Sequence, residues 1–342
     1  MSETAGMILA AGFGRRLLPA TRETPKPLLW YFGVPVLNLL VRQLHDAGLE
    51  DIMINAHYHR DQISEAVKNL PSPPHCQVSE EESVLGTGGA FAKIHPWRKG
   101  RDLLVVNGDI IHLFPLQKIL DQHKKSSALA TMGLIPTTLP GEASVWCTGK
   151  KVVSIGKESP RKDATPYGYA CIQVLSDKLL SRITEEKEVS IIAYYQDALR
   201  RGDLIEACVE DCFWNDIGTP RQYWEAHTSY LDLLKNTGSK QVFDPLFINH
   251  IRESFGHGPV RWFLKEKTFF SGSEIYGPCA FDSQISFERS VKAGPLAIVM
   301  GPVTLDLGIT ISHCLFHKST PYTISCNRSN IWESDSFVMH TG

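Results

Sequence analysis

The most informative segment of the chain is Met7–Leu29, which reads M-I-L-A-A-G-F-G-R-R-L-L-P-A-T-R-E-T-P-K-P-L-L. Its first residues, Met7–Ala11, form a short apolar run, which predicts a buried β-strand. The run ends at Gly12 and Gly14, and glycines let backbone N–H groups approach an anion closely. The stretch therefore predicts a phosphate-binding loop at the end of the first strand of an α/β sheet, where such ligands usually bind.

Positively charged residues follow the two glycines. Arg15 and Arg16 come directly after them, and Lys26 is held between two prolines, so these cations can supply the countercharge of a triphosphate. A dinucleotide fingerprint is excluded because Leu17 stands where its third glycine is needed, and a P-loop is excluded because no glycine precedes Lys-Ser or Lys-Thr. A lone Gly-x-Gly would favour an ordinary strand-to-helix turn with a basic surface patch, whereas Arg16 and Pro-Lys-Pro together favour a phosphate site.

The composition is that of an ordinary globular protein. With 342 residues, 43% hydrophobic and 21% charged, the chain is long for one compact domain, and we expect two. The formal net charge of -2 predicts no general affinity for nucleic acid or for an acidic membrane. No apolar run approaches the roughly 20 residues that span a bilayer, and the N-terminal apolar stretch is too short for a signal peptide. Eight scattered cysteines lack the paired spacing of a zinc site, so we expect reduced thiols and a cytoplasmic protein.

Residues 7–135 alternate short apolar runs with amphipathic segments, which predicts a Rossmann-like, mostly parallel sheet covered by helices on both faces. The segment 126–174 is richer in strand signals and predicts an insertion that covers the site from the other side. The expected strands are 52–55, 103–107, 130–134, 151–155 and 169–175, and the expected helices are 36–47, 116–124, 191–200 and 220–234.

Lys235–Lys240 (K-N-T-G-S-K) has the composition of a linker, which predicts a domain of residues 1–236 and a C-terminal β domain of residues 241–342. Beyond the linker, hydrophobic residues recur six apart, and hexapeptide periodicity is typical of a parallel β-helix. The series changes phase between 287 and 303, so the alternative is a small β-sandwich-like appendage. The recurring residues are Phe269, Ile275, Phe281 and Phe287, followed by Val303, Ile309 and Leu315.

Two aspartates follow apolar segments at positions suited to a metal. The run Leu103–Asp109 (L-L-V-V-N-G-D) places Asp109 at the C-terminal edge of the sheet, and Phe213–Pro220 presents Asp216 in a tight turn before a helix. Magnesium bound to a nucleotide prefers one or two carboxylates, with phosphate oxygens and waters completing its octahedron. Taken alone, either aspartate is explained by capping of its own backbone. Taken together with the first motif, they predict a pair of magnesium ligands.

The segment Leu85–Ala90 (L-G-T-G-G-A) precedes an expected helix at 90–94. By itself it is explained as a helix N-terminus with a glycine turn. With it, the motifs resemble, in order and approximate spacing, those of the nucleoside-diphosphate-sugar pyrophosphorylases, also called sugar-1-phosphate nucleotidyltransferases. The resemblance covers residues 7 to about 230.

The resemblance implies transfer of a nucleotidyl group from an NTP to a sugar 1-phosphate, with release of pyrophosphate and with Mg²⁺ as cofactor. It implies the nucleotide-diphospho-sugar transferase type of fold, a mixed, mostly parallel sheet flanked by helices. For the C-terminal domain, the six-residue period predicts an irregular left-handed β-helix. The implied catalytic residues are Arg16, Lys26 and Asp109, and the implied metal ligands are Asp109 and Asp216. The implied nucleotide-binding residues are Leu9, Ala11, Gly12, Gly14, Arg16, Lys26, Gly86, Thr87 and Gly88.

The chain departs from the family pattern near Lys157. The family shows Glu-Lys-Pro here, with the lysine holding the sugar phosphate, whereas this chain reads Gly156-Lys157-Glu158-Ser159-Pro160. The lysine is kept, and the preceding glutamate is replaced by glycine. The resemblance implies that Lys157 and Asn107 bind the sugar phosphate and that Gly168 lines the sugar pocket.

Within the family, residues 54–63 and 105–109 look most like bacterial mannose-1-phosphate guanylyltransferases and the related N-acetylmuramate-1-phosphate uridylyltransferase, which favours GTP or UTP. A phosphocholine cytidylyltransferase shares the first motif. A catalytically silent, sugar-nucleotide-sensing subunit should lack a motif residue, whereas this chain has all four of Arg16, Lys26, Asp109 and Asp216. A bifunctional enzyme with an acyltransferase β-helix would need a catalytic histidine context in the C-terminal region. We therefore expect that region to serve oligomerisation or regulation in a homo-oligomer that binds an NTP and a sugar 1-phosphate, but no nucleic acid and no membrane.

Overall fold

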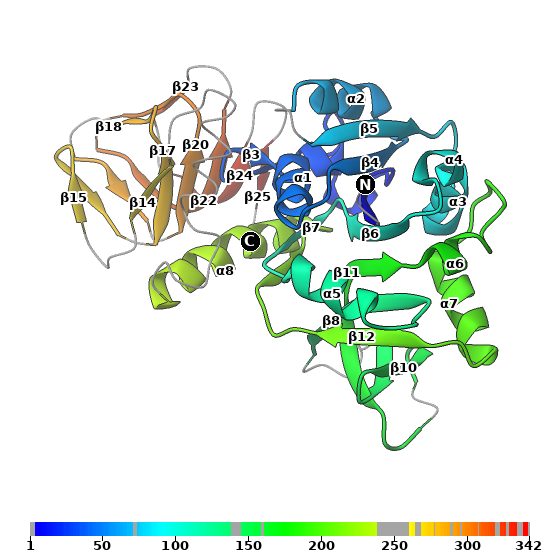
Figure 1. The fold of residues 1–342 in the computed structure, drawn as a ribbon. Helices are drawn as coiled ribbons and strands as arrows, with labels where there is room; N and C mark the ends of the chain where they lie inside the picture. Colours follow the sequence, from blue (N-terminus) through cyan, green and yellow to red (C-terminus); the bar gives the residue numbers. More distant parts are fainter. Residues whose placement is uncertain are drawn as a thin grey trace. The chain divides into compact units, whose positions relative to one another are not determined.

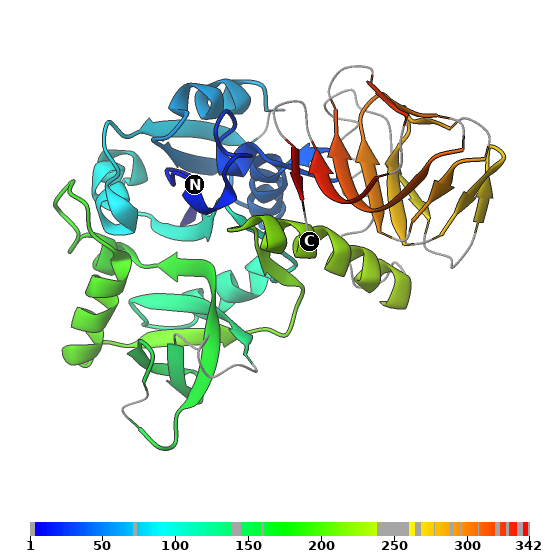
Figure 2. The same cartoon turned by 180° about the vertical axis from the view of Figure 1, so that it is seen from behind.

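The computed structural model describes residues 4–70, 74–137, 145–158, 161–237 and 260–340, apart from 264–267, 277, 288–289, 295, 307, 319–321, 326–327 and 334–337. The chain divides into two compact units, which Figures 1 and 2 show from opposite sides. Unit 1 comprises Met1–Phe13 and Leu40–Trp214, and unit 2 comprises Gly14–Leu39 and Asn215–Gly342. The expected linker begins inside helix α8 (Pro220–Thr237), and its last residues, 238–240, lie outside the described part.

The parallel half of the unit 1 sheet is built around β1 (Thr4–Leu9), which ends two residues earlier than expected. β4 (Asp51–Ala56) and β6 (Asp102–Asn107) flank β1 in parallel, and β5 (His75–Glu80) continues the sheet beyond β4. Strand order therefore reverses at β1, and open α/β sheets bind ligands at the carboxyl ends of strands at such a point. β1 and β6 consist mostly of buried residues, as expected for strands covered by helices on both faces.

The other half of this sheet is mainly antiparallel. β11 (Thr165–Leu175) runs antiparallel to both β6 and β8 (Ala130–Pro136), and β12 (Ile205–Val209) is parallel to β8. The sheet ends with β10 (Lys151–Ile155) and β9 (Val145–Thr148). The expectation of a separate insertion at 126–174 is thus wrong, because Ile172 of β11 pairs with Val106 of β6 and makes the segment continuous with the main sheet.

Helices cover the unit 1 sheet, and the apolar side chains of Met7 and Val105 join α3 and α7 in one core. The helices predicted at 116–124 and 191–200 are confirmed with these bounds. The helices of unit 1 are α2 (Arg60–Lys68), α3 (Gly86–Lys93), α4 (His95–Arg98), α5 (Leu116–Lys124), α6 (Asp177–Leu180) and α7 (Ile191–Arg200), and the short strand β7 (Ile110–His112) follows β6. At the unit boundaries lie α1 (Val36–Asp46) and β13 (Trp214–Asp216).

Unit 2 begins with two short 3₁₀ helices, Arg15–Leu17 and Lys26–Leu28, followed by a hairpin of β2 (Trp30–Tyr31) and β3 (Val34–Pro35). The hairpin packs on α8, where the buried Tyr31 hydroxyl donates to the carbonyl of Ala226 at 3.0 Å. Two ring stacks join these elements to the last strands of the chain, Trp30 on His317 and Tyr223 on Trp332, each with centroids 4.2 Å apart. The strands after residue 259 therefore contact the hairpin and α8.

Most of the described later strands pair in parallel at a spacing close to 18 residues. Glu274 pairs with Lys292 at 18 positions, whereas Ala297 pairs with Cys314 at 17 and Val303 pairs with Tyr322 at 19. The strands are β14 (Val260–Phe263), β15 (Thr268–Phe270), β16 (Ser273–Ile275), β17 (Cys279–Asp282), β18 (Ser286–Phe287), β19 (Lys292–Ala293), β20 (Ala297–Met300), β21 (Val303–Leu305), β22 (Thr310–His317), β23 (Tyr322–Ile324), β24 (Arg328–Glu333) and β25 (Val338–His340).

The six-residue period runs through this region without the expected change of phase. The first series continues beyond Phe287 through Ala293, Val299, Leu305 and Ile311, all of which are buried. A second buried series, also six apart, runs from Cys279 through Ile285, Val291, Ala297, Val303 and Ile309. The sequence suggested a break because alanine at 293 and 297 is a weak hydrophobic signal. The side chain of Phe269 lies outside the described residues.

No helix in the described part of the chain is long and apolar enough to cross a membrane. Among the cysteines that the structure describes, four are buried, namely Cys147, Cys208, Cys279 and Cys314. Burial raises the pKa of the Cys147 and Cys279 thiols to about 12. These thiols are therefore protonated and unreactive near neutral pH.

Candidate functional site

The carboxyl ends of β1, β4 and β6 lie side by side in unit 1. Leu9 pairs with Asn55 on one side and with Asn107 on the other. The Gly108 N–H donates to the Leu9 carbonyl at 2.8 Å, so the turn that carries the half-buried Asp109 is tied to the end of β1. Three of the predicted site residues, Leu9, Asn107 and Asp109, thus meet at the edge where α/β sheets bind ligands.

The phosphate loop, residues Ala10–Phe13, follows β1. Ala10 is buried, and its N–H donates to Asn55 Oδ1 at 2.7 Å, whereas Gly12 and Phe13 are exposed. A Cβ atom placed on Gly12 would meet no atom within 4 Å. Space beside Gly12 is therefore open, which suits a backbone that approaches an anion.

Gly14 begins the part of the motif that belongs to unit 2. Its φ of +64° favours glycine, and a Cβ there would come 2.9 Å from Thr21 Cγ2. The buried Thr21 hydroxyl donates to the Gly14 carbonyl at 2.8 Å and closes a compact turn that leaves Arg16 exposed. Sequence reasoning expected Gly14 to admit the nucleotide, and the structure adds that this glycine is needed for the turn itself.

Arg16, Lys26 and Asp216 converge in unit 2. Lys26 is buried, and its Nζ lies 3.6 Å from Asp216 Oδ1. A Cβ placed on Gly218 would lie 2.9 Å from Arg16 Nη2 and 3.0 Å from Asp216 Oδ2. Two cations near the N-terminus and a carboxylate 190 or more positions further along the chain thus form one group around Gly218. No role was predicted for this glycine.

The glycine turn, Leu85–Gly89, opens helix α3 earlier than the helix start predicted at residue 90. The segment before α7 packs directly on it: the Gly88 N–H donates to the Val189 carbonyl at 2.8 Å, and the Ile191 N–H donates to Thr87 Oγ1 at 2.7 Å. A Cβ on Gly86 would lie 2.7 Å from the Val189 oxygen. Close main-chain packing therefore explains these glycines, and contact of Gly86, Thr87 and Gly88 with a nucleotide stays a prediction.

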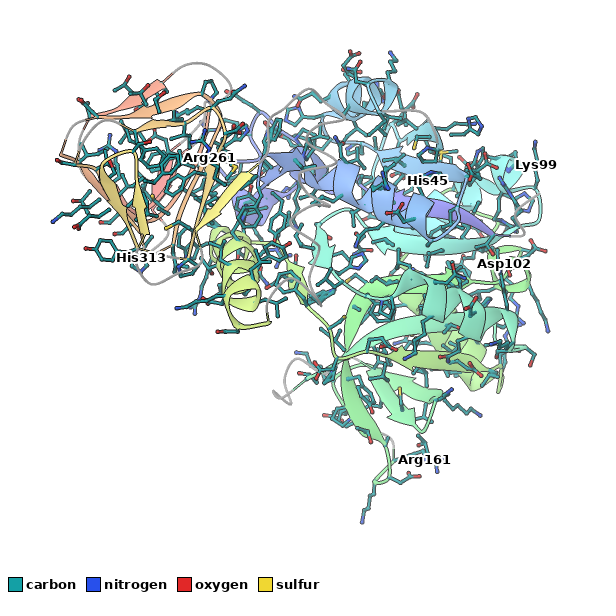
Figure 3. The ribbon with its side chains drawn as sticks, turned by 60° about the vertical axis from the view of Figure 1, so that its left-hand side comes forward. His45, Lys99, Asp102, Arg161, Arg261 and His313 are labelled. Atoms are coloured by element: carbon teal, nitrogen blue, oxygen red, sulfur yellow. The ribbon has the colours of Figure 1, made fainter. Side chains whose placement is uncertain are left out.

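The predicted sugar-phosphate residues outside the strand ends lie on the antiparallel half of the sheet. Gly168 is in β11 and pairs with Ile135 of β8. Lys157 is exposed just after β10. The same loop carries Arg161, which forms a two-bond ion pair with Asp163 and points away from the sheet in Figure 3. Among the described contacts, none joins Gly168 or Lys157 to Asp109.

The donor set suits a metal that also binds phosphate. Asp109 and Asp216 are both half-buried, and Asp109 lies on the turn after β6. Asp216 is the last residue of β13, so the tight turn predicted at this position is wrong. No group of three or more His, Cys, Asp or Glu side chains in the described residues could enclose a metal ion. Magnesium needs only one or two carboxylates when phosphates and waters fill its remaining positions, so each aspartate by itself suits a nucleotide-associated ion rather than a protein cage.

Sequence reasoning missed two buried polar residues, Asn55 and Glu81. The Asn55 Nδ2 group donates to Glu81 Oε1 at 2.7 Å, and Glu81 Oε2 accepts from the Leu85 N–H at 3.1 Å. The one available signal was the polar Asn55 at the end of the apolar run Ile52–Asn55. Glu81 gave none, because it lies in a run of three glutamates that suggests an exposed segment.

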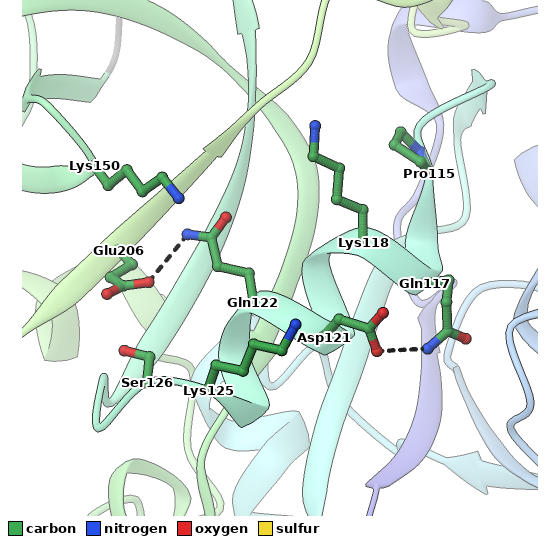
Figure 4. A pocket seen from close by; sticks show the side chains of 9 residues that line it. All are labelled: Pro115, Gln117, Lys118, Asp121, Gln122, Lys125, Ser126, Lys150 and Glu206. Atoms are coloured by element: carbon green, nitrogen blue, oxygen red, sulfur yellow. Dashed lines mark hydrogen bonds between the residues drawn. The ribbon is translucent and has the colours of Figure 1, made fainter.

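A separate depression lies between α5, strand β12 and the turn that joins β9 to β10 (Figure 4). Lys118, Lys125 and Lys150 line it, and the Gln122 amide donates to Glu206 at 3.0 Å. None of the predicted site residues lines this depression. It is therefore a different feature from the strand-end site.

Comparison with known proteins identifies the family. Residues 5–232 match the family described as nucleotidyl transferase. The chain belongs to the nucleotidyl transferase family. It is 26% identical over 315 residues to mannose-1-phosphate guanylyltransferase 1 of Arabidopsis thaliana, a match that covers 90% of this chain and 80% of the relative. It is 28% identical over 223 residues to the mannose-1-phosphate guanylyltransferase of Mycobacterium tuberculosis, covering 64% of this chain and 62% of that enzyme.

Solved structures agree with this assignment. HddC from Yersinia pseudotuberculosis, complexed with GMP-PN, matches with a TM-score of 0.54 and 25% identity, covering 66% of this chain and 99% of HddC. A UDP-glucose pyrophosphorylase complexed with UDP-glucose matches with a TM-score of 0.58 and 15% identity, covering 67% of this chain and 99% of that structure. The nucleotidyl transferase region of this chain thus has the nucleotide-diphospho-sugar transferase fold, with the mixed sheet and helices that the sequence predicted.

Proposed function

We propose that this protein transfers a nucleoside monophosphate from an NTP, GTP or UTP, to a sugar 1-phosphate, giving an NDP-sugar and pyrophosphate. The observation that carries the proposal is the convergence of Arg16, Lys26 and Asp216 around Gly218, because two cations beside a carboxylate suit a triphosphate with its metal. The names of the curated relatives, both mannose-1-phosphate guanylyltransferases, support the substrate class.

The chemistry needs no covalent intermediate. An oxygen of the sugar phosphate attacks the α-phosphorus in line, and the bond to the β-phosphate breaks as pyrophosphate leaves. Catalysis therefore consists mainly of positioning and charge neutralisation. In this proposal Lys26 and Arg16 neutralise the triphosphate and the leaving pyrophosphate, and Arg16 also stabilises the transition state. Gly12 and Gly14 let the main chain approach the phosphates.

Asp109 and Asp216 would hold Mg²⁺, which would supply positive charge to the phosphate oxygens. Leu9 and Ala11 would contact the nucleotide at the end of β1. Gly86, Thr87 and Gly88 would contact the base and ribose from the N-terminus of α3. Lys157 and Asn107 would hold the acceptor phosphate, and Gly168 would line the sugar pocket.

We further propose that residues 1–236 carry this chemistry and that the strands after residue 241 form a β-helix that serves oligomerisation or regulation. The spacing of 17 to 19 residues between parallel partners is close to three six-residue repeats, and two buried series follow that period. A cytoplasmic homo-oligomer is our working hypothesis, to be tested by its mass in solution.

The test is a pyrophosphate-release screen of four NTPs against a set of sugar 1-phosphates and phosphocholine, with and without Mg²⁺. We expect release with GTP or UTP and a sugar 1-phosphate, and only in the presence of Mg²⁺. Release with CTP and phosphocholine alone would replace the proposal by a choline-type cytidylyltransferase. Binding of a sugar nucleotide without turnover of any pair would instead indicate a sensing subunit.

A further inference from the structure

Asn55 and Glu81 are polar side chains buried in the middle of unit 1, and the proposed reaction does not use them. Asn55 is 3% exposed and Glu81 is 1% exposed. Asn55 lies near the end of β4, and Glu81 comes directly after β5. A buried carboxylate is costly unless hydrogen bonds satisfy it, so its retention here calls for a physical reason.

The two side chains form a continuous bridge between two loops. The Ala10 N–H of the phosphate loop donates to Asn55 Oδ1 at 2.7 Å, and Asn55 Nδ2 donates to Glu81 Oε1 at 2.7 Å. The second carboxylate oxygen, Oε2, accepts from the Leu85 N–H of the glycine turn at 3.1 Å. Each polar atom of the bridge therefore has a partner of the right kind, acceptor against donor.

The backbone of Glu81 is fixed as firmly as its side chain. Its N–H donates to the Ala56 carbonyl at 2.7 Å, and its carbonyl oxygen lies 3.0 Å from His57 Nδ1. Within the described part of the chain, Glu81 forms no ion pair, and neutral N–H groups satisfy both carboxylate oxygens. A carboxylate is well suited to this place because it accepts at both ends, which an amide cannot do.

We propose that Asn55 and Glu81 are positioning residues that hold the phosphate loop and the glycine turn in one fixed arrangement, so that the phosphates and the base of one nucleotide meet preformed partners. This inference rests on the proposed function, because only a nucleotide needs both loops at once. We expect neither side chain to touch the substrate, because both are buried. They contact the two loops through the N–H groups of Ala10 and Leu85.

The polarity of the bridge makes a rescue experiment possible. In Glu81→Gln the side chain at position 81 has one acceptor oxygen for two donors, Asn55 Nδ2 and the Leu85 N–H. In Asn55→Asp two carboxylates face each other, and neither can donate a hydrogen bond. In the double variant N55D/E81Q the aspartate accepts from Ala10 N–H and from the glutamine amide, while the glutamine oxygen accepts from Leu85 N–H. All three hydrogen bonds and the single negative charge are then restored with donor and acceptor exchanged.

We expect each single variant to lower kcat/KM for the NTP by roughly 100-fold, because a displacement of about 1 Å at a positioned group has an effect of this size. The KM for the sugar 1-phosphate and the ratio of GTP to UTP usage should not change. The double variant should recover to within about tenfold of the wild type. Glu80→Gln is the matched control, because Glu80 is an exposed neighbour whose carboxylate accepts from Ser64 Oγ.

Amide hydrogen exchange on the protein without substrates gives a second readout. Peptides containing Ala10 and Leu85 should exchange faster in both single variants and return toward wild-type rates in the double variant. The proposal would be overturned if kcat/KM of the double variant fell by the product of the two single-variant losses. It would also be overturned if the single variants exchanged their amide hydrogens at wild-type rates. An altered GTP-to-UTP ratio would also overturn it, because Glu81 would then contact the base directly. Absence of turnover by the wild type would refute the proposed function, while the exchange pattern would still decide the role of the bridge.

Discussion

The sheet of unit 1 and the strands after residue 259 in unit 2 both use parallel pairing, but they differ in what joins the paired strands. Gly6 of β1 pairs with Ile52 of β4, and the long intervening segment contains the phosphate loop, Arg16 and Lys26. In the later strands Glu274 pairs with Lys292 only 18 positions on, and the short strands β17 and β18 lie between them in the chain. Both arrangements bury apolar side chains, and only the first leaves room for functional loops.

The length of the connection between parallel strands determines which residues are available for a functional site. A long connection brings polar residues to the carboxyl end of its strand, where α/β proteins bind ligands. A short connection repeats one backbone path, so its residues are committed to close packing. At Gly301, for example, a Cβ atom would lie 1.7 Å from the Lys318 carbonyl oxygen. We therefore expect substitutions to affect chemistry in the first region and stability in the second.

The largest expected effect is loss of activity in Asp109→Ala. Removing this carboxylate should lower pyrophosphate release about 1000-fold, because it removes charge organisation at the transferring phosphoryl group. The urea midpoint of unfolding should stay at the wild-type value, since Asp109 is only half-buried on a turn. Asp121→Ala, on the exposed surface of α5, is the control. Full activity in Asp109→Ala would refute its assignment as a metal ligand.

Gly301→Ala should destabilise the later strands and leave the catalytic activity unchanged. The clash with Lys318 and a φ of +95° should together cost about 3 kcal/mol of unfolding free energy. Gly308→Ala is a matched control in the same region, because its φ is +73° and a Cβ there would meet no atom within 4 Å. Urea unfolding of both variants checks this, and equal destabilisation would mean that close packing at Gly301 is unimportant.

Two buried histidines, one in each unit, should make the stability of the protein depend on pH. Burial lowers the pKa of His112 in unit 1 to about 3 and that of His227 in unit 2 to about 4. Above the ordinary pKa of about 6.5 both states are neutral and stability is full. As pH falls toward 4, the unfolded chain takes up protons that the folded chain does not, so each histidine should remove about 2–3 kcal/mol of stability by pH 4.5.

His227→Phe tests the unit 2 contribution. This variant should lose less stability than the wild type between pH 6.5 and 4.5. The slope of its unfolding free energy against pH should correspond to about one proton fewer taken up on unfolding. His95→Phe, at an exposed histidine, should keep the wild-type slope. An unchanged slope in His227→Phe would show that His227 is not a buried neutral group.

The smallest expected effect is that of Gly218→Ala. The added Cβ would press on the ends of the Arg16 and Asp216 side chains, which can shift cheaply, so we expect a loss in kcat/KM of roughly tenfold. Gly218 belongs to the same unit as Gly301, yet its substitution should change activity and leave the urea midpoint unaltered. A change in stability alone would contradict the convergence of the two side chains on this glycine.

Much of the fold could be read from the sequence because it rests on periodicity. The strand at 103–107 and the helices at 116–124 and 191–200 are confirmed, since apolar spacing reports directly which face an element buries. The continuous six-residue period was harder to read, because Ala293 and Ala297 fill inward positions with little hydrophobic signal. The membership of β9, β10 and β11 in the main sheet could not be read, because strand order depends on contacts between distant segments.

The family could be recognised from the amino-acid sequence alone, because the glycines and cations of residues 12–26 and the segments that end in Asp109 and Asp216 follow the order and approximate spacing of its motifs. Only the tertiary structure decided that Arg16 and Asp216 converge on Gly218, and that Asn55 and Glu81 link the phosphate loop to the glycine turn. The physical reason is that a hydrogen bond between buried side chains depends on the three-dimensional register of strands. A run of three glutamates looks exposed until the fold buries one of them.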